Sequence, residues 1–433
     1  MQLFSTNSPQ QSVSLRQAVL EGLPKDNGLY MPKQISPLPK SFFQALPSLS
    51  FPELSFQVAH HLLGESISSE KLREIVFDAM NFDTPVHWLD SQTGILELFH
   101  GPTLAFKDVG ARFMARLMGH FVENDPETLT ILVATSGDTG GAVASGFFQT
   151  PGIEVVILYP KGKVSPLQEK QLTTLGHNVQ ALRIDGSFDD CQAMVKSAFL
   201  DQELQSKRRL SSANSINIAR LIPQSFYYFR AWQQVENPEH PLCFVVPSGN
   251  FGNLTAGLFA AKMGLPIAHF VAATNANDVV PQYLAHGKYL PRPSVRTISN
   301  AMDVGRPSNF VRMDSLFDSD WQMMRQMISG FAYNDTQTRE AIRKVEDKFG
   351  YIIDPHGAVG VLAWEAFRRQ HPQYQGIILE TAHPAKFLEV MAESLDKTID
   401  LPPAMAALVD KKCVCTDLPA SFDALKSELL AHA

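Results

Sequence analysis

One lysine of this sequence stands where its amine could act as a nucleophile. Lys107 directly follows Leu104, Ala105 and Phe106, so its side chain is expected in apolar surroundings rather than on a solvated loop. Removal from water disfavours the ammonium form and lowers the pKa of a lysine. The neutral amine can then attack a carbonyl group and form a Schiff base. The alternative is a surface lysine at the start of a helix.

Two glycine-rich segments each follow an apolar, strand-like run and precede a helix-like run. They are ATSGDTGG at residues 134–141 and PSGNFGN at residues 247–253. Ligands of parallel α/β proteins bind at the carboxyl ends of strands, where the free N–H groups of helix N-termini hold anions. Neither segment matches GxGxxG, GxxxxGK[ST] or GxSxG, which removes the main support for dinucleotide-binding, Walker-type and hydrolase functions. Each segment alone could also be a simple tight turn.

The second segment has the character of a phosphate-binding loop. Its backbone N–H groups could hold a phosphate at roughly 1.5–3 kcal/mol for each charge-assisted hydrogen bond, before ordering costs. Such a loop needs no cationic side chain, which leaves Lys107 free for chemistry. A Schiff-base lysine combined with a phosphate loop indicates pyridoxal 5′-phosphate (PLP) as the cofactor.

The elements that must position these residues alternate between strands and helices. Strand-like apolar runs lie at residues 128–135, 152–160, 178–185, 241–247, 267–274 and 376–382. This alternation predicts an α/β fold with a mostly parallel sheet. The segment 165–176 is predicted as a helix with Ser165 as its N-cap, Gln168 completing a capping box, and Gly176 just after its end.

Length and composition restrict the function further. A chain of 433 residues is expected to form two or three domains, and its formal net charge of −7 argues against general nucleic-acid binding. Four cysteines are too few for a disulfide framework, and the CVC pair at 413–415 lacks a second ligand pair, so no metal site is predicted. No signal peptide is visible, and PSGNFGN interrupts the longest uncharged run, 241–261. We therefore expect a cytoplasmic protein that does not insert into a membrane.

Several segments, taken in order, give the chain a resemblance to a known family. The chain resembles the threonine synthases, in the longer of the two forms of that family, nearly from end to end. No single segment is decisive, whereas their order and spacing together are highly specific. The segments are NGLYMP, LFHGPTLAFKD, ATSGDTG, LYPKGKVSPLQEKQ, NSINIAR, VPSGNFGN, AATNAND, SNAMDVGRPSN and TAHPAKF.

The resemblance implies a fold, a domain order and a reaction. The family belongs to the tryptophan-synthase-β type of PLP enzyme, fold type II, with two parallel-sheet α/β domains and the cofactor between them. A small mixed N-terminal domain is expected over residues 1–90, the catalytic region over 91–390 and a C-terminal helical extension over 391–433. The implied lyase reaction converts O-phospho-L-homoserine and water to L-threonine and phosphate through a PLP aldimine, γ-elimination and β-addition of water.

The resemblance also assigns cofactor contacts. Lys107 is expected to hold PLP and to move protons, and Thr381 is expected to face the pyridine nitrogen, where a hydroxyl does not enforce ring protonation as a carboxylate would. Asp138 lies where many relatives have Asn near the ring hydroxyl, so we expect it to share a proton there. The PLP phosphate is expected on the backbone of Gly249, Asn250, Phe251, Gly252 and Asn253.

Substrate contacts are implied in the same way. The doubly charged substrate phosphate is expected at Asn214, Ser215 and Arg220 of NSINIAR, because arginine presents a planar fork to phosphate. Lys163 and Arg306 are two further cation candidates that the sequence does not rank. The substrate carboxylate is expected on the first glycine-rich loop, at Thr135, Ser136 and Thr139.

Other functions stay open on the sequence. A serine or threonine dehydratase, or a threonine-synthase-like PLP phospholyase, would share the lysine, the loop and the hydroxyl. A dehydratase needs no site for a substrate phosphate, so NSINIAR and the NGLYMP domain argue against it. A non-catalytic protein that binds a phosphorylated metabolite would not need Lys107. The sequence is compatible with a monomer or a homodimer.

Overall fold

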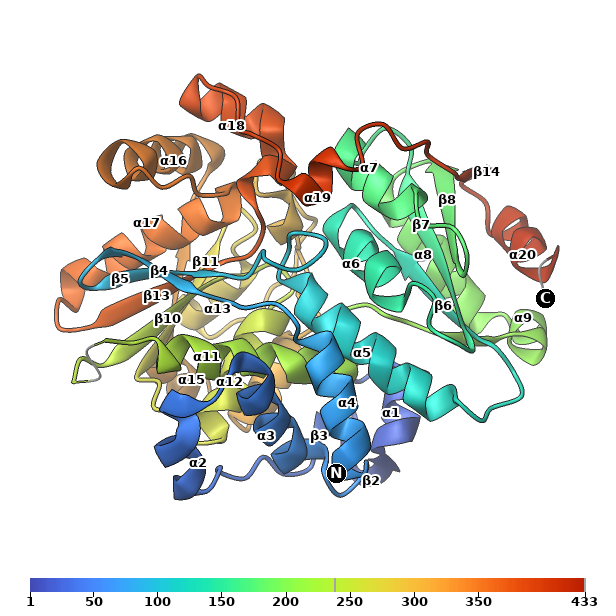
Figure 1. Ribbon diagram of the computed structural model, residues 1–433, viewed down its shortest axis with the longest axis horizontal. Helices are drawn as coiled ribbons and strands as arrows, with labels where there is room; N and C mark the ends of the chain where they lie inside the picture. The colour runs from blue at the N-terminus through green and yellow to red at the C-terminus, as the bar shows by residue number, and fades with distance from the viewer. Residues whose placement is uncertain (237–238, 432–433) are drawn as a thin grey trace.

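A computed structural model describes residues 1–236 and 239–431 of the chain (Figure 1). Three sheets organise it: a small antiparallel sheet near the N-terminus and two larger sheets that form separate lobes. The two lobes lie side by side in Figure 1, with the N-terminal domain below them. The prediction of an α/β fold with mostly parallel sheets is confirmed.

The first lobe is built on a five-stranded sheet of order β14-β8-β7-β6-β9, in which every neighbouring pair is parallel. Both β6 and most of β7 are buried along their length, as expected for strands covered on both faces. The strands are β6 (Leu129–Ala134), β7 (Ile153–Pro160), β8 (Val179–Asp185), β9 (Arg209–Ser211) and β14 (Thr416–Pro419). Its helices are α6 (Asp138–Phe147), α7 (Pro166–Thr173), α8 (Phe188–Leu200) and α9 (Gln202–Lys207).

The second lobe is built on a six-stranded sheet of order β12-β11-β10-β13-β5-β4. All neighbouring pairs are parallel except β4 with β5, which form an antiparallel hairpin at one edge. The strands are β4 (Val86–Asp90), β5 (Thr93–Glu97), β10 (Leu242–Pro247), β11 (His269–Thr274), β12 (Ile328–Ala332) and β13 (Gln375–Glu380). Its helices include α12 (Gly252–Lys262), α13 (Val279–His286), α14 (Phe310–Leu316), α15 (Trp321–Met327), α16 (Asp335–Phe349) and α17 (Pro355–Gln370).

The N-terminal domain combines a small sheet with short helices. Its strands are β1 (Gln2–Ser5), β2 (Ser8–Ser14) and β3 (Tyr30–Pro32), and its helices are α1 (Leu15–Glu21), α2 (Lys40–Ala45), η1 (Leu46–Ser48), α3 (Phe51–Leu63) and α4 (Ser69–Ala79). A capping box between Ser50 and Glu53 starts α3 and satisfies N–H groups that the first helical turn leaves free. The buried faces of α3 and α4 pack on α11 (Phe226–Gln233) and on the long helix α5 (Lys107–Val122).

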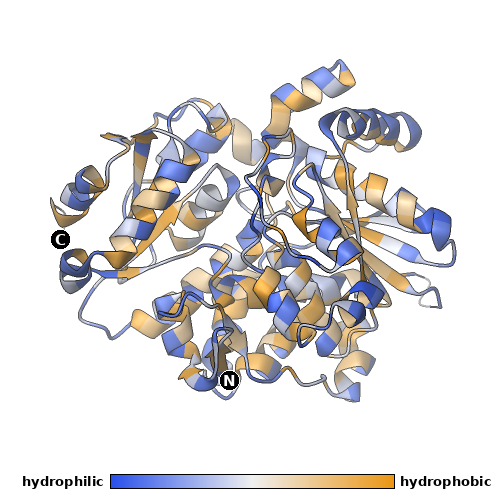
Figure 2. Cartoon of the chain, turned by 180° about the vertical axis from the view of Figure 1, so that it is seen from behind, coloured by the Kyte–Doolittle hydropathy of each residue, from blue (hydrophilic) through white to orange (hydrophobic). Residues whose placement is uncertain are grey.

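One hydrophobic cluster joins the three regions. It runs from Leu54 and Val58 of α3 through Phe113 of α5 to Phe244 of β10 and Leu379 of β13. Apolar residues are concentrated on the strands and on the inner faces of the helices, while the outer helix faces are hydrophilic (Figure 2). Among the described residues, no helix combines the length and the apolar composition that crossing a membrane requires.

The C-terminal part and one helix differ from the prediction. The remaining helices are α10 (Ile218–Leu221), η2 (Ile222–Ser225), η3 (Asn300–Met302), η4 (Pro384–Phe387), α18 (Leu388–Leu395), α19 (Pro403–Ala406) and α20 (Phe422–Ala431). Between α19 and α20 the chain adds β14 beside β8, so the last residues complete the first sheet and do not form helices alone. Helix α7 begins after Ser165 as predicted but ends at Thr173, before Gly176.

Candidate active site

A cavity of about 710 Å³ is lined by residues of both lobes. Segments that follow β6, β10 and β13 border it, together with the first turns of α5, α6 and α12. This is where parallel α/β sheets bind ligands. All the predicted cofactor and substrate residues line the cavity, including Arg306, with one exception. The exception is Lys163, which is exposed and does not border it, so its role stays a prediction.

The Lys107 amine is removed from water, as the sequence predicted. Its side chain is 15% exposed, and Nζ lies 3.6 Å from Oδ2 of Asp138 and 5.5 Å from the centre of the Phe106 ring. Burial lowers the pKa of Lys107, and the positive charges of Lys386 and Arg220 act in the same direction, while Asp138 opposes them. The amine therefore loses its proton more readily than an ordinary lysine and is suited to nucleophilic and base chemistry.

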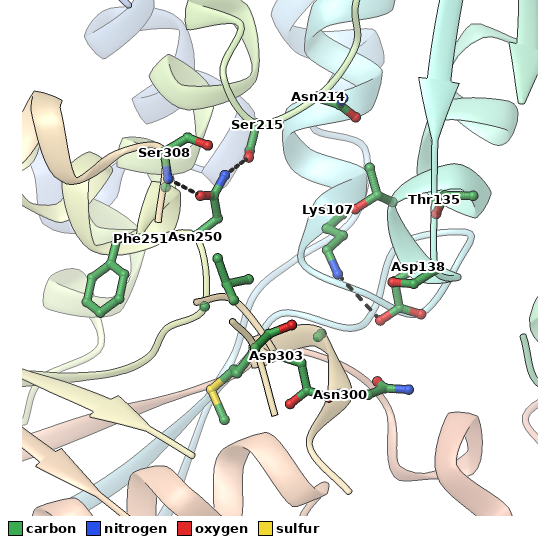
Figure 3. Close-up of a pocket in the computed structure, with 18 of the residues that line it drawn as sticks. Lys107, Thr135, Asp138, Asn214, Ser215, Asn250, Phe251, Asn300, Asp303 and Ser308 are labelled. Carbon is green, nitrogen blue, oxygen red and sulfur yellow. Dashed lines mark hydrogen bonds and ion pairs between the residues drawn. The ribbon is translucent and has the colours of Figure 1, made fainter. Parts of the chain in front are cut away.

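Asp138 begins α6 and belongs to the loop of residues 134–138 after β6, which we call the acid loop. Its Oδ1 accepts from Lys386 Nζ at 2.7 Å and from Gln168 Nε2 at 2.8 Å. Lys107 faces its other oxygen, Oδ2 (Figure 3). Burial alone would raise the pKa of Asp138, but the two lysines outweigh it and hold the pKa well below its usual value. The carboxylate is thus ionised here, with cationic side chains compensating its charge, and proton sharing with a ring hydroxyl stays a prediction.

Lys386 is a site residue that the sequence analysis missed. Its side chain is fully buried, and besides Asp138 its Nζ donates to the Thr103 carbonyl at 2.8 Å and to Gln171 Oε1 at 3.2 Å. It lies in η4, within TAHPAKF. A signal was available, because PAKF places a lysine directly beside apolar residues, as LAFKD does for Lys107.

The predicted capping box of α7 is wrong for a related reason. Ser165 does cap the helix by accepting from the Gln168 N–H. The Gln168 side-chain oxygen, however, accepts from the Ser165 hydroxyl at 3.0 Å and not from the N-cap N–H, while its amide nitrogen donates to Asp138 of another helix. A hydrogen bond to a charged group is about twice as strong as one between neutral groups, so the contact with Asp138 helps to orient this side chain.

The cradle loop, residues 247–253, joins β10 to α12. Phe251 is the N-cap in the left-handed conformation, with φ of 60°, and its ring points away from the cavity (Figure 3). No described residue accepts a hydrogen bond from the backbone N–H groups of residues 249–253. A set of unpaired N–H groups at the start of an 11-residue helix is a site for an anion such as a phosphate.

The cradle loop is tightly packed from behind. A Cβ on Gly249 would lie 2.7 Å from both the Ala301 carbonyl oxygen and Met302 Cα, which are backbone atoms with little freedom to move. Asn250 connects the loop to its neighbours: its Nδ2 donates to Ser215 Oγ at 2.6 Å, and its Oδ1 accepts from the Ser308 N–H (Figure 3). The cradle loop and the NSINIAR segment are therefore held together directly.

Arg220 brings a cation to the same cavity. It is 3% exposed, and within the described part of the chain its guanidinium makes one hydrogen bond, from Nη1 to the Ala213 carbonyl at 2.6 Å. A guanidinium has five N–H groups, so most of the Arg220 donors are free for a ligand. Burial lowers the pKa of Arg220 to about 10, which still leaves it charged at neutral pH. Arg306, in contrast, is exposed.

The three residues predicted to bind the substrate carboxylate differ in how accessible their side chains are from the cavity. Thr135 is buried, and its hydroxyl accepts from the N–H groups of Gly137 and Gly140 at 3.0 and 2.9 Å, which shapes the acid loop. Ser136 is exposed to the cavity and Thr139 is half-buried, so these two have side chains available for a ligand.

Thr381 follows β13 and lines the cavity, with 7% of its surface exposed. Its carbonyl accepts from the Phe106 N–H at 2.9 Å, which fixes it next to the segment that carries Lys107. Of the histidines, His100 and His383 do not border the cavity, whereas His356 does. The sequence analysis missed His356.

His356 and the AATNAND motif support the segment that packs behind the cradle loop. His356 Nε2 accepts from the Ala301 N–H at 3.2 Å, and Nδ1 lies 2.9 Å from Asp354 Oδ2. Asn275 donates to Asp303 at 2.9 Å from the other side. These contacts give AATNAND and SNAMDVGRPSN a structural role that the sequence did not reveal.

Comparisons with known proteins agree with this geometry. Family models match the chain as "Threonine synthase N terminus" over residues 2–80, as "Pyridoxal-phosphate dependent enzyme" over 82–379 and as "Threonine synthase, C-terminal" over 357–428. Threonine synthase of Escherichia coli is 44% identical over the full length of both chains, and that of Pseudomonas aeruginosa is 33% identical over 100% of this chain and 98% of its own.

Solved structures give the same result. The crystal structure of the Escherichia coli enzyme superposes with a TM-score of 0.92 over all of both chains. PLP-bound threonine synthase from Brucella melitensis, 34% identical, superposes with a TM-score of 0.93 over 100% of this chain and 99% of that one. The chain belongs to the threonine synthase family of PLP-dependent enzymes.

Proposed function

We propose that this protein converts O-phospho-L-homoserine and water to L-threonine and phosphate. One observation carries the choice of substrate: the cavity that holds the desolvated Lys107 offers two anion sites. The unpaired N–H groups of the cradle loop form one, and Arg220 with its free donors forms the other. The phosphate of PLP needs one of them. A second site is expected when the substrate also carries a phosphate.

The residues present fit PLP. The cradle loop would hold its phosphate, Lys107 would bind its aldehyde carbon, and Thr381 and Asp138 would serve the ring nitrogen and the ring hydroxyl. PLP supplies an electron sink for a carbanion formed beside the substrate amine. The charge of Asp138 is already compensated by Lys386, so the carboxylate can lie near a ring oxygen without an uncompensated negative charge.

The chain's own groups would bind and orient the substrate. Arg220, Ser215 and Asn214 would take its phosphate, since Arg220 has unused donors and Ser215 is already fixed by Asn250. Ser136 and Thr139 would take its carboxylate, with Thr135 shaping the loop beneath them. Two charged ends held at fixed points place the carbons between them next to Lys107, which is how orientation lowers a barrier.

Proton movement falls to Lys107. The reaction takes protons from Cα and Cβ, expels phosphate from Cγ and adds water at Cβ. A lysine whose pKa is lowered by burial can take a proton at Cα and return one to a neighbouring carbon, because burial favours its neutral form. Arg220 stays charged and balances the departing phosphate.

The wider assignments are part of the same proposal. We infer an N-terminal domain over 1–90, a catalytic region over 91–390 and a C-terminal extension over 391–433, here with β14 included in that extension. A cytoplasmic location is supported by four free cysteines, two of them buried. The protein acts as a monomer or a homodimer.

A product assay tests the substrate and the reaction together. The visible spectrum of the purified protein is recorded, O-phospho-L-homoserine is added, and phosphate and threonine are measured. A visible band that shifts, with phosphate and threonine in equal amounts, supports the proposal. Phosphate with 2-oxobutanoate in place of threonine would indicate a phospholyase, which would use the same two anion sites. Absence of both band and product would contradict the role of Lys107.

A further inference from the structure

The Asp138 carboxylate lies between two lysines, and the two contacts are unequal. Lys386 Nζ is 2.7 Å from Oδ1, whereas Lys107 Nζ is 3.6 Å from Oδ2. Lys386 is fully buried, while Lys107 keeps 15% of its side-chain surface exposed toward the cavity. The stronger ion pair is therefore the one that does not include the reactive lysine.

Lys386 is also held in place by other groups. Its Nζ donates to the Thr103 carbonyl at 2.8 Å and to Gln171 Oε1 at 3.2 Å, so all three ammonium hydrogens have acceptors. Thr103 in turn holds Asp108, donating to its carboxylate from N–H and Oγ1 at 2.8 and 2.6 Å. This arrangement fixes Lys386 as a permanent partner of Asp138.

The remaining charges near Lys107 do not replace that partner. Arg220 on α10 and Lys386 on η4 are positive and disfavour an ammonium at Lys107. Asp108, the next residue on α5, is engaged by Thr103, and its pKa is raised by burial. Asp138 on α6 is thus the group that would retain a proton on Lys107 if its own charge were not compensated.

We propose that Lys386 is a positioning residue that occupies the Asp138 carboxylate and so releases Lys107 as the neutral amine that captures PLP. The inference rests on the proposed role of Lys107. In the capture step the nitrogen lone pair bonds to the aldehyde carbon of PLP, and the aldehyde oxygen leaves as water with the two amine hydrogens. An ammonium has no lone pair to give. Removing the charge of Lys386 would leave Asp138 to pair with Lys107.

The test measures how fast apoenzyme captures PLP as a function of pH, from the growth of the visible band. Lys386→Gln keeps N–H donors but removes the charge. An uncompensated carboxylate at this distance raises a lysine pKa by about 1–3 units, so the midpoint should move up by at least about 1 pH unit and capture at pH 7 should slow about tenfold. Lys344→Gln, which removes an exposed lysine paired with Glu365, is the matched control and should leave the profile unchanged.

The double variant Lys386→Gln/Asp138→Asn separates charge from packing. It replaces the ion pair by a neutral pair, so the carboxylate and the ammonium that compensates it are removed together. The pH midpoint of PLP capture should therefore lie within about half a pH unit of the wild-type midpoint. This comparison holds even if the single variant does not fold. A folded single variant with an unchanged midpoint, or a double variant that stays shifted, would overturn the inference.

Peptide mapping after borohydride reduction tells a failed inference from a failed proposed function. PLP attached to Lys107 in wild type and variants supports the assignment of the reactive lysine. PLP attached to Lys386 or to another lysine would refute that assignment itself. If PLP is attached to Lys107 but the pH profile of PLP capture is the same with and without Lys386, the proposed function is retained and only the inference is refuted.

Discussion

The acid loop and the cradle loop are built on the same plan. Each connects the carboxyl end of a buried parallel strand, β6 or β10, to a helix. Each turns at an N-cap residue with positive φ, 145° at Gly137 and 60° at Phe251. Each also borders the same cavity. The same strand-to-helix turn therefore occurs in both lobes.

The two loops differ in charge. The acid loop carries Asp138, and two lysines gather around it. The cradle loop has no charged residue, and its N–H groups at residues 249–253 have no acceptor among the residues that the structure describes. A strand-to-helix turn is intrinsically attractive to anions because of its exposed N–H groups. One carboxylate in that position changes it into a site that attracts cations, as the two lysines beside Asp138 show.

The largest effect is expected from removing the reactive group beside the acid loop. Lys107→Ala should lower kcat by about 10³-fold or more, because covalent attachment of the cofactor and proton transfer fail together. The measurement is phosphate and threonine release from O-phospho-L-homoserine, with Lys344→Ala as a surface control. Turnover near the wild-type rate would show that the acid loop does not serve a catalytic lysine.

The second prediction concerns the NSINIAR segment beside the cradle loop, where we expect the substrate phosphate to bind. Arg220→Gln should lower kcat/KM by about 100-fold, since a charge-assisted contact to phosphate is worth about 1.5–3 kcal/mol, while PLP affinity stays near wild type. The exposed Arg306 provides the control, and Arg306→Gln should cost less than about tenfold. A larger loss for Arg306→Gln would place the substrate phosphate elsewhere.

The third prediction concerns the packing of the cradle loop. Gly249→Ala would press a Cβ against Ala301 and Met302 backbone atoms at 2.7 Å. Overpacking of this kind costs about 1–3 kcal/mol, so PLP affinity, measured by titration of apoenzyme, should fall about tenfold. In Gly252→Ala the new Cβ would meet its nearest protein atom at 3.5 Å, and we expect a smaller loss. Equal losses at both positions would contradict the packing argument.

The last prediction, no larger in its expected effect than the third, comes from making the cradle loop resemble the acid loop. Asn250→Asp keeps the shape of the side chain and its acceptor for the Ser308 N–H but adds a negative charge. With an effective dielectric constant of about 20 near the surface, repulsion of the PLP phosphate should weaken cofactor binding about tenfold. Asn334→Asp, at the N-cap of α16 outside the cavity, adds the same charge and should change nothing. An unchanged PLP affinity in Asn250→Asp would show that the cradle loop does not hold the phosphate.

Much of this site could be predicted from local patterns. Lys107 was identified by its apolar neighbours, the cradle loop by its glycines after a strand, and the α/β fold by alternating strands and helices; the structure confirms the fold and brings the two loops to one cavity. These features depend on short stretches of chain. A few consecutive residues are enough to indicate a buried strand and the turn that follows it.

The partners of Asp138 could not be predicted in this way. Gln168 was assigned to a local capping box and Lys386 was overlooked, yet both bind the same carboxylate from positions 30 and 248 residues away, the latter being the difference 386 − 138. His356 was missed for the same reason, because its partner Ala301 lies 55 residues away. β14 also joined the first sheet from a segment that had no strand signal.

The sequence by itself determined which residues could do chemistry, since the reactivity of a lysine in an apolar run and the anion affinity of a glycine-rich turn arise locally. The tertiary structure decided which charged groups surround Asp138 and Lys107, and therefore which of the two lysines is the nearer partner of the carboxylate. Electrostatic interaction depends on distances in space of a few ångströms, and only the folded chain places Lys386 nearer to Asp138 than Lys107 is.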